Sequence, residues 1–377
     1  MSSRKSVWKE LKYWAVAMLI MAILFEIVSS MFFSYKYGGG KFALQQTAER
    51  FVTDKPQLSH YHKIQNEVRP DSSAETSRRI ADEIWDANKY SYEPWLQFKV
   101  TDLESKYVNI KGFDRKSIPS EFINPKSKDT FDIYFFGGST MYGYNVSDAE
   151  TIPSQFLKLY KEKYPNGKSV RIRNLGIPYY FSKQELLLYS KLLFEGERPD
   201  IVVFMDGLND FYPSRMLYYD KPHFSYAMQQ VFDEQIFLKK KRTIVDSSEN
   251  FYLDVPNLPA NEYYETLMQK YLNHVKQGTK LSDAVGIKSF FFCQPVPFYN
   301  YPNRDKDPIS YKVSYPRFDY IYPKLAQQSI PNFRFLGNML ENEKGLPFVD
   351  QVHYSPAFCT KIAQEMLGTI ENSILEQ

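Results

Sequence analysis

The stretch Asp132-Ile-Tyr-Phe-Phe-Gly-Gly-Ser139-Thr-Met-Tyr-Gly143 predicts a buried strand that runs into a glycine-rich turn presenting a serine. The apolar part of this stretch is rich in β-branched and aromatic residues, as expected for a central strand of a parallel sheet. The two glycines let the backbone turn sharply and leave the amides around Ser139 unshielded. Taken alone, the stretch is equally consistent with an ordinary Gly-Gly-Ser turn. Ser139 becomes a candidate nucleophile only if the chain also supplies a base and donors for an oxyanion.

Predicted helices and strands alternate after Ser139. Hydrophobic periodicity predicts helices over residues 151–164, 182–195 and 262–285, the second opened by a capping box of Ser182 and Glu185. Apolar runs predict strands over residues 169–174, 201–205 and 289–293. This alternation predicts a parallel sheet with helices on both faces, and ligands then bind beyond the carboxyl ends of the strands. The residues that follow the predicted strand ends are Ser139, Gly176, Asn209 and Gln294.

The C-terminal part of the chain supplies a candidate base. Asp350 precedes His353 by three residues, and Ser355-Pro356 then begins a predicted last helix. An aspartate at this spacing can hold the imidazole in one tautomer while the other ring nitrogen faces a serine. Donors for an oxyanion are the N–H groups of Ser139 and Gly176 and the side-chain amide of Asn209.

The order of these blocks resembles the SGNH (GDSL-type) hydrolases over roughly residues 132–367. The matching blocks are Gly137-Gly-Ser139-Thr-Met-Tyr-Gly143, Asn174-Leu-Gly176, Gly207-Leu-Asn209-Asp210 and Asp350-x-x-His353. Gly138 stands where the family has an aspartate, and Tyr179 stands where its second block often has a further glycine.

The resemblance implies an α/β, three-layer, flavodoxin-like fold with a parallel sheet. It also implies Ser139 as nucleophile, His353 as base and Asp350 as the residue that orients the base. Ser139, Gly176 and Asn209 would form the oxyanion hole. Further candidates for substrate contact are Asp210, Tyr142 and Gln294.

Membrane-anchored proteins of this kind act on acyl groups of exported or cell-surface polysaccharides. The resemblance therefore implies a serine esterase that removes O-acyl groups, such as O-acetyl groups, through an acyl-enzyme, with an acylated carbohydrate or another ester as substrate. A polysaccharide O-acetyltransferase would use the same triad and is the alternative. A non-catalytic binding or scaffold protein of an envelope assembly is a further alternative. No metal or organic cofactor is expected.

The N-terminus predicts a membrane anchor. Basic residues precede an apolar run over residues 13–33, which is about the length of one membrane-spanning helix. The positive charges place residues 1–12 in the cytoplasm and export the remainder to the periplasm or the extracellular space. A cleaved signal peptide and a helix of a soluble core are the alternatives. Glu26, within the run, hints at partner proteins in the membrane.

The remaining organisation is less well defined by the sequence. Residues 34–129 are expected to form a stalk and packing segment that includes a helix near residues 76–88 and a strand over residues 107–113. Residues 130–377 form the hydrolase-like domain, with an insertion over about residues 212–260. His223 is a weaker candidate for the base, because it has no acidic residue at close spacing, and His274, in the middle of a predicted helix, is expected at the surface.

Composition excludes several classes of protein. The net charge of +3 gives no reason to expect a nucleic-acid partner. Two cysteines, Cys293 and Cys359, make neither a disulfide framework nor a metal cluster, and His60 and His62 lack further ligands nearby. The 30 tyrosines and 29 phenylalanines suggest amphipathic surface or a groove that faces carbohydrate.

Overall fold

The computed structural model describes residues 12–14, 16–28, 63–117, 130–211, 260–305 and 315–376. The chain divides into two units, Met1–Lys63 and Ile64–Gln377. In the first unit, residues 12–14 and 16–28 are helical. No helix in the described ranges combines the length and apolar character needed to cross a membrane. The anchor predicted over residues 13–33 extends into residues 29–33, which lie outside those ranges, and it stays a prediction.

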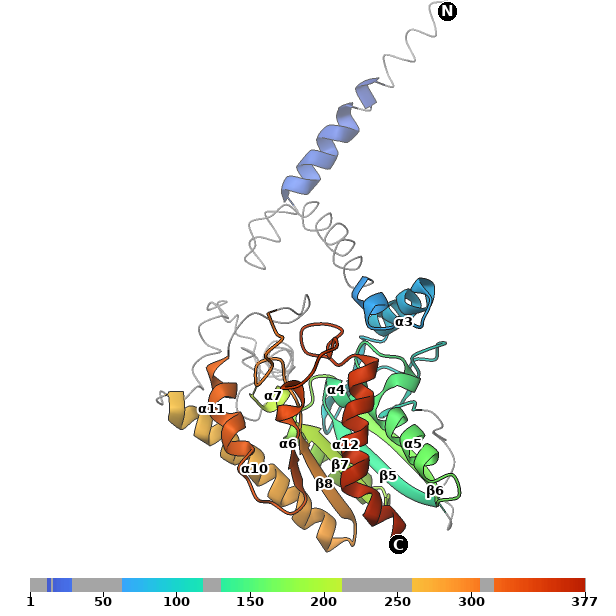
Figure 1. The fold of residues 1–377 in the computed structure, drawn as a ribbon. Helices are drawn as coiled ribbons and strands as arrows, with labels where there is room; N and C mark the ends of the chain where they lie inside the picture. Colours follow the sequence, from blue (N-terminus) through green and yellow to red (C-terminus); the bar gives the residue numbers. More distant parts are fainter. Residues whose placement is uncertain are drawn as a thin grey trace, which may run out of the picture. The chain divides into compact units, whose positions relative to one another are not determined.

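The second unit is organised around a seven-stranded sheet in the order β3-β4-β6-β5-β7-β8-β9 (Figure 1). The strands are β3 (Ile110–Lys111), β4 (Asp114–Arg115), β5 (Thr130–Gly137), β6 (Ser169–Gly176), β7 (Ile201–Asp206), β8 (Lys288–Cys293) and β9 (Phe333–Phe335). Strands β5 to β9 pair in parallel, whereas β3 and β4 form an antiparallel hairpin at the β6 edge. The prediction of an α/β fold with a mostly parallel sheet is therefore confirmed.

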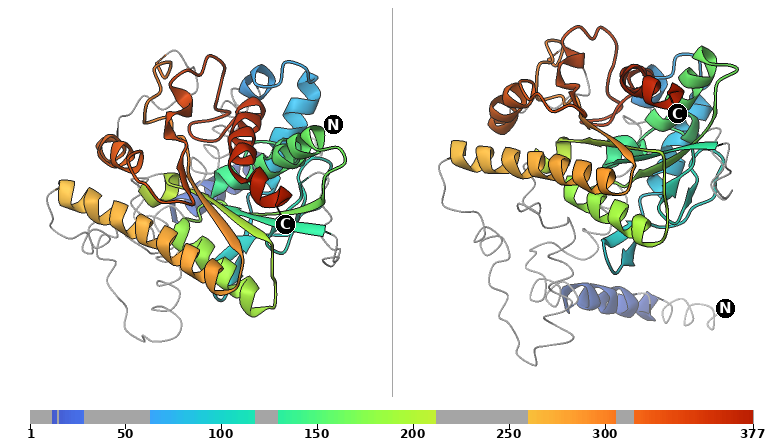
Figure 2. Two further views of the ribbon diagram at one scale, coloured as in Figure 1. Left: turned by 60° about the horizontal axis from the view of Figure 1, so that its bottom comes forward. Right: turned by 90° about the horizontal axis from the view of Figure 1, so that it is seen from below.

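Helices cover both faces of the sheet, as Figure 2 shows in its right-hand view. Helices α5 (Ile152–Lys163) and α12 (Pro356–Leu375) pack on one face. Helices α6 (Ser182–Phe194) and α10 (Ala260–Ala284) pack on the other face, and α11 (Pro316–Leu325) packs against α10. The remaining helices are α3 (Ala74–Asp86) and the single turns α4 (Ser139–Tyr142) and α7 (Leu208–Phe211). Two 3₁₀ turns span Asp148–Glu150 and Gly337–Leu340.

Strand β5 lies at the centre of the sheet because nearly all of its side chains are buried. On the face covered by α6 and α10, the ring of Phe204 stacks between Phe136 and Phe291, with centroid distances of 4.9 and 4.8 Å. Aromatic pairs of this kind contribute about 0.5–1.5 kcal/mol each beyond their buried area. Part of the high aromatic content thus forms this core, rather than the surface groove that composition suggests.

The predicted elements agree with the structure in most places, with two corrections. Helix α6 begins at Ser182, but its N-cap is Phe181, so the predicted capping box is wrong. The hydroxyl of Ser182 instead donates to the carboxylate of Asp210. The strand expected over residues 107–113 is reduced to β3. Strand β9 and helix α11 are not among the predicted elements, although the buried residues of α11 recur at helical spacing.

Residues 64–117 belong to the second unit and share its core. This collar segment (residues 64–117) contains α3 and a hairpin of β1 (Tyr90–Glu93) and β2 (Gln97–Val100). Ile80, Ile84 and Phe98 are at most 3% exposed and join the core cluster beside α6 and α10. Residues 34–62 and 118–129 of the predicted stalk lie outside the described ranges, as does the predicted insertion up to residue 259.

Candidate active site

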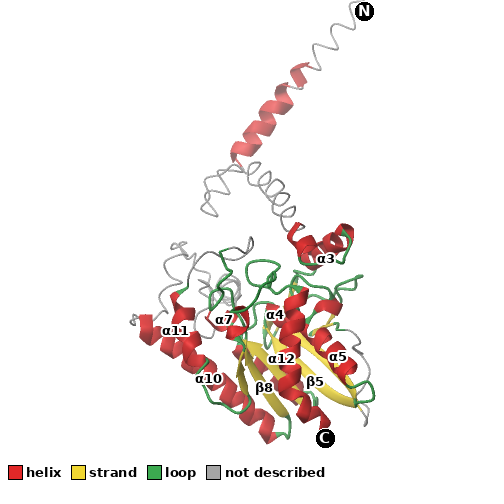
Figure 3. Ribbon diagram, in the orientation of Figure 1, coloured by secondary structure: helices red, strands yellow, loops and turns green. Residues whose placement is uncertain are grey.

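The candidate nucleophile lies where β5 ends and α4 begins. Ser139 is the first residue of α4, and Gly138 is its N-cap. Gly143 ends this single turn with φ +81°, a left-handed conformation that suits glycine. Figure 3 shows α4 and α7 among the loops at the same end of the strands. The carboxyl ends of the parallel strands therefore gather the predicted site, as the alternating pattern implies.

A chain of hydrogen bonds joins the three residues of the predicted triad. Oγ of Ser139 lies 2.7 Å from Nε2 of His353. Nδ1 of His353 lies 2.7 Å from Oδ2 of Asp350. The other carboxylate oxygen of Asp350 accepts the backbone N–H groups of Val352 and His353 at 2.9 and 2.8 Å. The structure thus brings together a serine, an imidazole and a carboxylate in the geometry that proton transfer from the serine requires.

Asp350 is held in its ionised form. Burial raises its pKa, but the charge of His353, the hydrogen bond from its ring and the two backbone N–H groups outweigh burial, so that the pKa lies below the ordinary value. Its side chain is 26% exposed and that of His353 15%. A carboxylate that stays charged can stabilise the imidazolium formed when the serine loses its proton.

A closed loop positions His353 and Asp350. The N–H of Val349 donates to the carbonyl of His353 at 2.8 Å, and the N–H of Ser355 donates to the carbonyl of Pro347 at 2.8 Å. Ser355 then caps α12 by accepting the N–H of Phe358 at 3.3 Å, as predicted. Both ends of the loop are therefore fixed by backbone hydrogen bonds.

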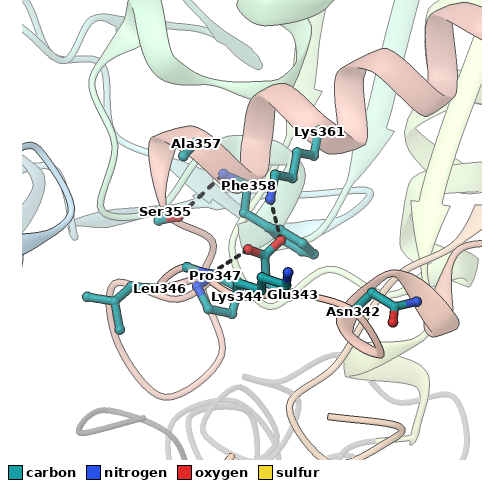
Figure 4. Close-up of a pocket in the computed structure, with 10 residues that line it drawn as sticks. Asn342, Glu343, Lys344, Leu346, Pro347, Ser355, Ala357, Phe358 and Lys361 are labelled. Carbon is teal, nitrogen blue, oxygen red and sulfur yellow. Dashed lines mark hydrogen bonds and ion pairs between the residues drawn. The ribbon is translucent and has the colours of Figure 1, made fainter. Parts of the chain in front are cut away.

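Residues 342–347, which precede this loop, pack against the start of α12 around a pocket of about 290 Å³ (Figure 4). Nζ of Lys361 lies 2.6 Å from Glu343, and the N–H of Gly345 donates to the same carboxylate at 2.8 Å. Burial raises the pKa of Glu343, and these contacts more than offset it, so the pKa is lowered. No residue of the triad lines this pocket. Its contacts attach the triad loop to α12.

Two neighbouring residues that the sequence does not single out complete the surroundings of the triad. The side-chain amide of Asn145 donates a short hydrogen bond to Oδ2 of Asp350. The ring of Tyr144 packs on that of His353, with a centroid distance of 4.7 Å and an interplanar angle of 35°. Asn145 has φ +72°, and asparagine tolerates this left-handed conformation better than most residues. Tolerance of that conformation is the only local signal, because the partner of Asn145 lies 205 residues further along the chain.

The collar segment holds the loop that carries Tyr144 and Asn145. Arg115 is 1% exposed, and its guanidinium donates to the carbonyls of Gly143 and Val146 at 2.8 and 2.6 Å. The same group forms an ion pair with Asp148 at 3.0 Å. Arg69 donates to the carbonyl of Asn145 at 3.1 Å and pairs with Glu150 at 2.7 Å. These arginines thus satisfy the carbonyls of a loop that has little regular structure of its own.

The candidate oxyanion donors are in different situations. Nδ2 of Asn209 donates one N–H to the carbonyl of Tyr180 at 2.6 Å, which leaves a second N–H on the same amide. A Cβ on Gly138 would lie 2.6 Å from this Nδ2. Glycine at this position, where the family has an aspartate, therefore lets Asn209 lie against the backbone beside Ser139. The N–H of Gly176 donates to Oδ1 of Asn174 at 3.1 Å, so the structure places this predicted donor in a contact within its own strand end.

The three candidates for substrate contact are all engaged inside the protein. Tyr142 is 2% exposed, and its ring faces the guanidinium of Arg115 at 4.6 Å. Gln294 is 3% exposed and accepts the hydroxyl of Thr140 at 3.2 Å. Asp210 accepts the hydroxyl of Ser182, as described above. Tyr142 and Gln294 are thus packed in the core, and the half-buried Asp210 is bound by Ser182 of α6. The structure therefore gives no support to these three residues as substrate contacts.

A pair of buried carboxyl groups lies beside α7. Glu185 is fully buried and Asp206 is 5% exposed, and in the described part of the chain no donor group bonds either oxygen of Glu185. Burial, followed by the charge of Asp206 and a hydrogen bond to it, raises the pKa of Glu185 well above its ordinary value. Burial and the charge of Asp210 likewise raise the pKa of Asp206. Burial therefore favours the protonated form of both carboxyl groups in the folded protein.

The described histidine, cysteine and acidic residues do not form a metal site. In residues 63–117, 130–211, 260–305 and 315–376, and in the described N-terminal helix, no group of three or more His, Cys, Asp or Glu side chains could hold an ion. Cys293 and Cys359 are both buried free thiols. His60, His62 and His223 lie outside the described ranges, whereas the Nδ1 of His274 lies 2.7 Å from the hydroxyl of Ser182.

Comparison with known proteins gives a weak likeness to esterases. No protein-family model matches the chain, and no curated protein matches it. Among solved structures, a variant of Axe2, an acetyl xylan esterase from Geobacillus stearothermophilus, is 16% identical with a TM-score of 0.35, and the match covers 64% of this chain and 94% of that one. The psychrotrophic esterase EstA from Pseudoalteromonas sp. is 11% identical with a TM-score of 0.34, over 64% of this chain and 97% of that one. A structure described as a lipolytic protein of the G-D-S-L family, from Desulfitobacterium hafniense, is 11% identical with a TM-score of 0.36, over 63% of this chain and 98% of that one.

Proposed function

We propose that this chain is a serine esterase of the SGNH type that removes O-acyl groups, in particular O-acetyl groups, from carbohydrate. The observation that carries the proposal is the unbroken hydrogen-bonded chain from Oγ of Ser139 through His353 to Asp350. A serine outside an active site has no need for a base that is itself oriented by a carboxylate. The choice of a carbohydrate ester comes from the sequence resemblance.

The mechanism follows from the roles of these groups. His353 takes the proton of Ser139 as the hydroxyl attacks the ester carbonyl, and Asp350 stabilises the imidazolium that results. The second N–H of Asn209 and the backbone N–H of Ser139 are the donors for the oxyanion. His353 returns the proton to the departing alcohol, which leaves an acyl group on Ser139. Water, activated by the same imidazole, then releases the acid and restores the serine.

Hydrolysis and transfer differ only in the last step. If a sugar hydroxyl replaces water as the acceptor, the same acyl-enzyme yields an O-acetylated carbohydrate. We retain transfer as an outcome of the test below, since the triad serves both reactions equally.

We further propose, from the sequence alone, that the protein is held in the membrane by residues 13–33 with its catalytic domain exported. The basic residues that precede the apolar run support this orientation. Membrane fractionation and protease accessibility of the C-terminus in intact cells test it. A protein recovered in the cytosolic fraction, with its C-terminus protected, would overturn this placement.

The test of the chemistry uses the full chain and a fluorophosphonate probe, which forms a stable adduct with an activated serine. We expect mass spectrometry to locate the adduct on Ser139 and to find none in the Ser139→Ala or His353→Ala variants. Hydrolysis of an acetyl ester should fall by roughly a thousandfold or more in both variants. Ser190→Ala, a change in α6 outside the site, is the matched control and should retain activity. An adduct on another serine, or full activity without His353, would refute the mechanism.

The incubations with the acetyl ester are run with and without an oligosaccharide acceptor. Acyl gain on the oligosaccharide, dependent on Ser139, would identify a transferase. Release of free acid at a rate that the acceptor does not change would identify an esterase.

A further inference from the structure

Tyr179 adopts a backbone conformation that a tyrosine rarely adopts. Its φ is +69°, in the left-handed region, where a residue with a Cβ is strained by about 1–2 kcal/mol and glycine is not. The strain is retained although the ring is 37% exposed and so gains only part of the free energy of burial. A strained residue that persists beside a candidate active site points to a role for its side chain.

The backbone at Tyr179 runs close to the turn that carries the nucleophile. The following carbonyl, that of Tyr180, lies 2.9 Å from where a Cβ on Gly138 would be, so residues 179–180 run directly beside the turn that presents Ser139. The N–H of Ile177 donates to the carbonyl of Gly137 at 3.0 Å and fixes the start of this crossing.

Two other tyrosines lie beside Tyr179, each from a different part of the chain. The ring of Tyr90, in β1 of the collar segment, lies 5.8 Å from that of Tyr179, at an interplanar angle of 58°. Tyr144 packs on His353, and its N–H donates to the carbonyl of Ser139 at 2.9 Å. We call these three residues the tyrosine platform.

The phenol groups of the platform stay protonated at neutral pH. Burial, followed by the neighbouring tyrosines, raises the pKa of Tyr90. Burial, followed by Tyr179 and Asp350, raises the pKa of Tyr144, and burial raises the pKa of Tyr179. Each ring is therefore neutral, and the hydroxyl of Tyr90 donates to Oδ1 of Asn88 at 2.7 Å. Tyr179, the most exposed of the three, presents an aromatic face.

Building on the esterase function proposed above, we propose that the tyrosine platform binds the alcohol side of the ester and that this alcohol is a pyranose ring. The C–H groups on one face of a pyranose are weakly positive and match the negative face of an aromatic ring. A long acyl chain has no such polarised face, and an aliphatic wall would suit it better. Tyr179 is thus a residue that determines specificity.

The experiment compares two kinds of acetyl ester, which share the acyl group and differ in the alcohol. The substrates are mono-O-acetylated methyl pyranosides of several sugars and ethyl acetate, with ethyl octanoate as a probe of the acyl side. The variants are Tyr179→Gly, Tyr179→Asn and Tyr179→Phe. Asparagine tolerates the left-handed backbone but removes the ring, and phenylalanine keeps the ring without its hydroxyl.

We expect kcat/KM for the best pyranoside ester to fall by about threefold to tenfold in Tyr179→Gly and Tyr179→Asn, mainly through KM, and to be largely kept in Tyr179→Phe. The loss on ethyl acetate should be smaller, so that the ratio of kcat/KM for the pyranoside ester to kcat/KM for ethyl acetate falls in Tyr179→Gly and Tyr179→Asn. Equal losses on both acetyl esters would mean that Tyr179 acts through the backbone beside Ser139, and would overturn the proposal. So would a loss confined to ethyl octanoate, or no loss on any ester.

A binding measurement separates this inference from the proposed chemistry. Calorimetric titration of the Ser139→Ala protein with the same pyranoside esters needs no turnover. If the wild type hydrolyses none of the esters but Tyr179→Asn still weakens pyranoside binding, the esterase function fails and the platform stands. If hydrolysis depends on Ser139 but binding ignores Tyr179, the platform fails and the esterase function stands.

Discussion

Replacing Glu185 by glutamine should make the stability of the protein less dependent on pH. Glu185 is fully buried in α6 near Asp206 of β7, and burial raises the pKa of both carboxyl groups. Asp210 and the ring of His274 lie close by. The folded protein therefore retains a proton that the unfolded chain releases above a pH of about 4.3. A proton held only by the folded state makes stability fall as pH rises.

The magnitude follows from that one proton. A group whose pKa is raised by folding contributes its full stability below the unfolded pKa, and the contribution is lost as pH rises toward the folded pKa. Each retained proton changes the unfolding equilibrium constant by about tenfold per pH unit between the unfolded pKa and the raised folded pKa. Glutamine is neutral at every pH and can donate its amide to Asp206. We therefore expect Glu185→Gln to reduce this slope and to be more stable than the wild type at about pH 7.

Urea unfolding, followed by circular dichroism at pH intervals between about 5 and 8, measures the effect. The matched control is Glu195→Gln, which removes the same charge just beyond the same helix but at an exposed position, and which should leave the slope unchanged. A Glu185→Gln protein that keeps the wild-type slope would refute the proposal that folded Glu185 retains a proton. So would one that is less stable than the wild type at every pH.

Three further predictions concern the triad and its supports. Asp350→Asn should lower kcat by about a thousandfold to ten-thousandfold at unchanged fold, because the amide cannot stabilise the imidazolium; steady-state kinetics beside a near-ultraviolet spectrum checks both, and retained kcat would contradict the role. Gly138→Ala should lower kcat by about a hundredfold, because its Cβ would lie 2.6 Å from Nδ2 of Asn209 and displace an oxyanion donor; a loss confined to KM would argue against that reason. Asn145→Ala should lower kcat by about tenfold and Asn145→Asp by more, since a second carboxylate beside Asp350 repels it; equal rates in the two variants would show that the hydrogen bond does not matter.

Local sequence signals are sufficient for strands β5 to β8, and they single out the serine, histidine and aspartate that hydrogen bonds join. A strand such as β5 is defined by its own apolar residues, and Ser139 and His353 each follow a recognisable local pattern. The carboxyl ends of parallel strands converge wherever such a sheet forms, so the order of the blocks was enough to bring these residues together.

Long-range contacts explain the corrections. Ser182 and Glu185 have the spacing of a capping box, but Ser182 donates to Asp210 of α7 and Glu185 is fully buried, so neither side chain caps the helix. The N–H of Gly176, predicted as an oxyanion donor, instead donates to the side-chain oxygen of Asn174. Asn145 could not be predicted at all, because its partner is near the other end of the chain. In each case the deciding contact lies outside any local window.

The two buried arginines of the collar segment have a consequence for where the enzyme begins. The sequence blocks start near residue 132, so a shortened protein beginning at residue 130 would keep every residue of the triad. It would lack Arg69 and Arg115, and the carbonyls of Gly143, Asn145 and Val146 would lose their donors. Removing one side of a buried ion pair such as Arg115–Asp148 costs about 3–5 kcal/mol. A shortened protein that keeps these contacts therefore has to start near residue 64, because the collar segment supports the loop beside the candidate triad.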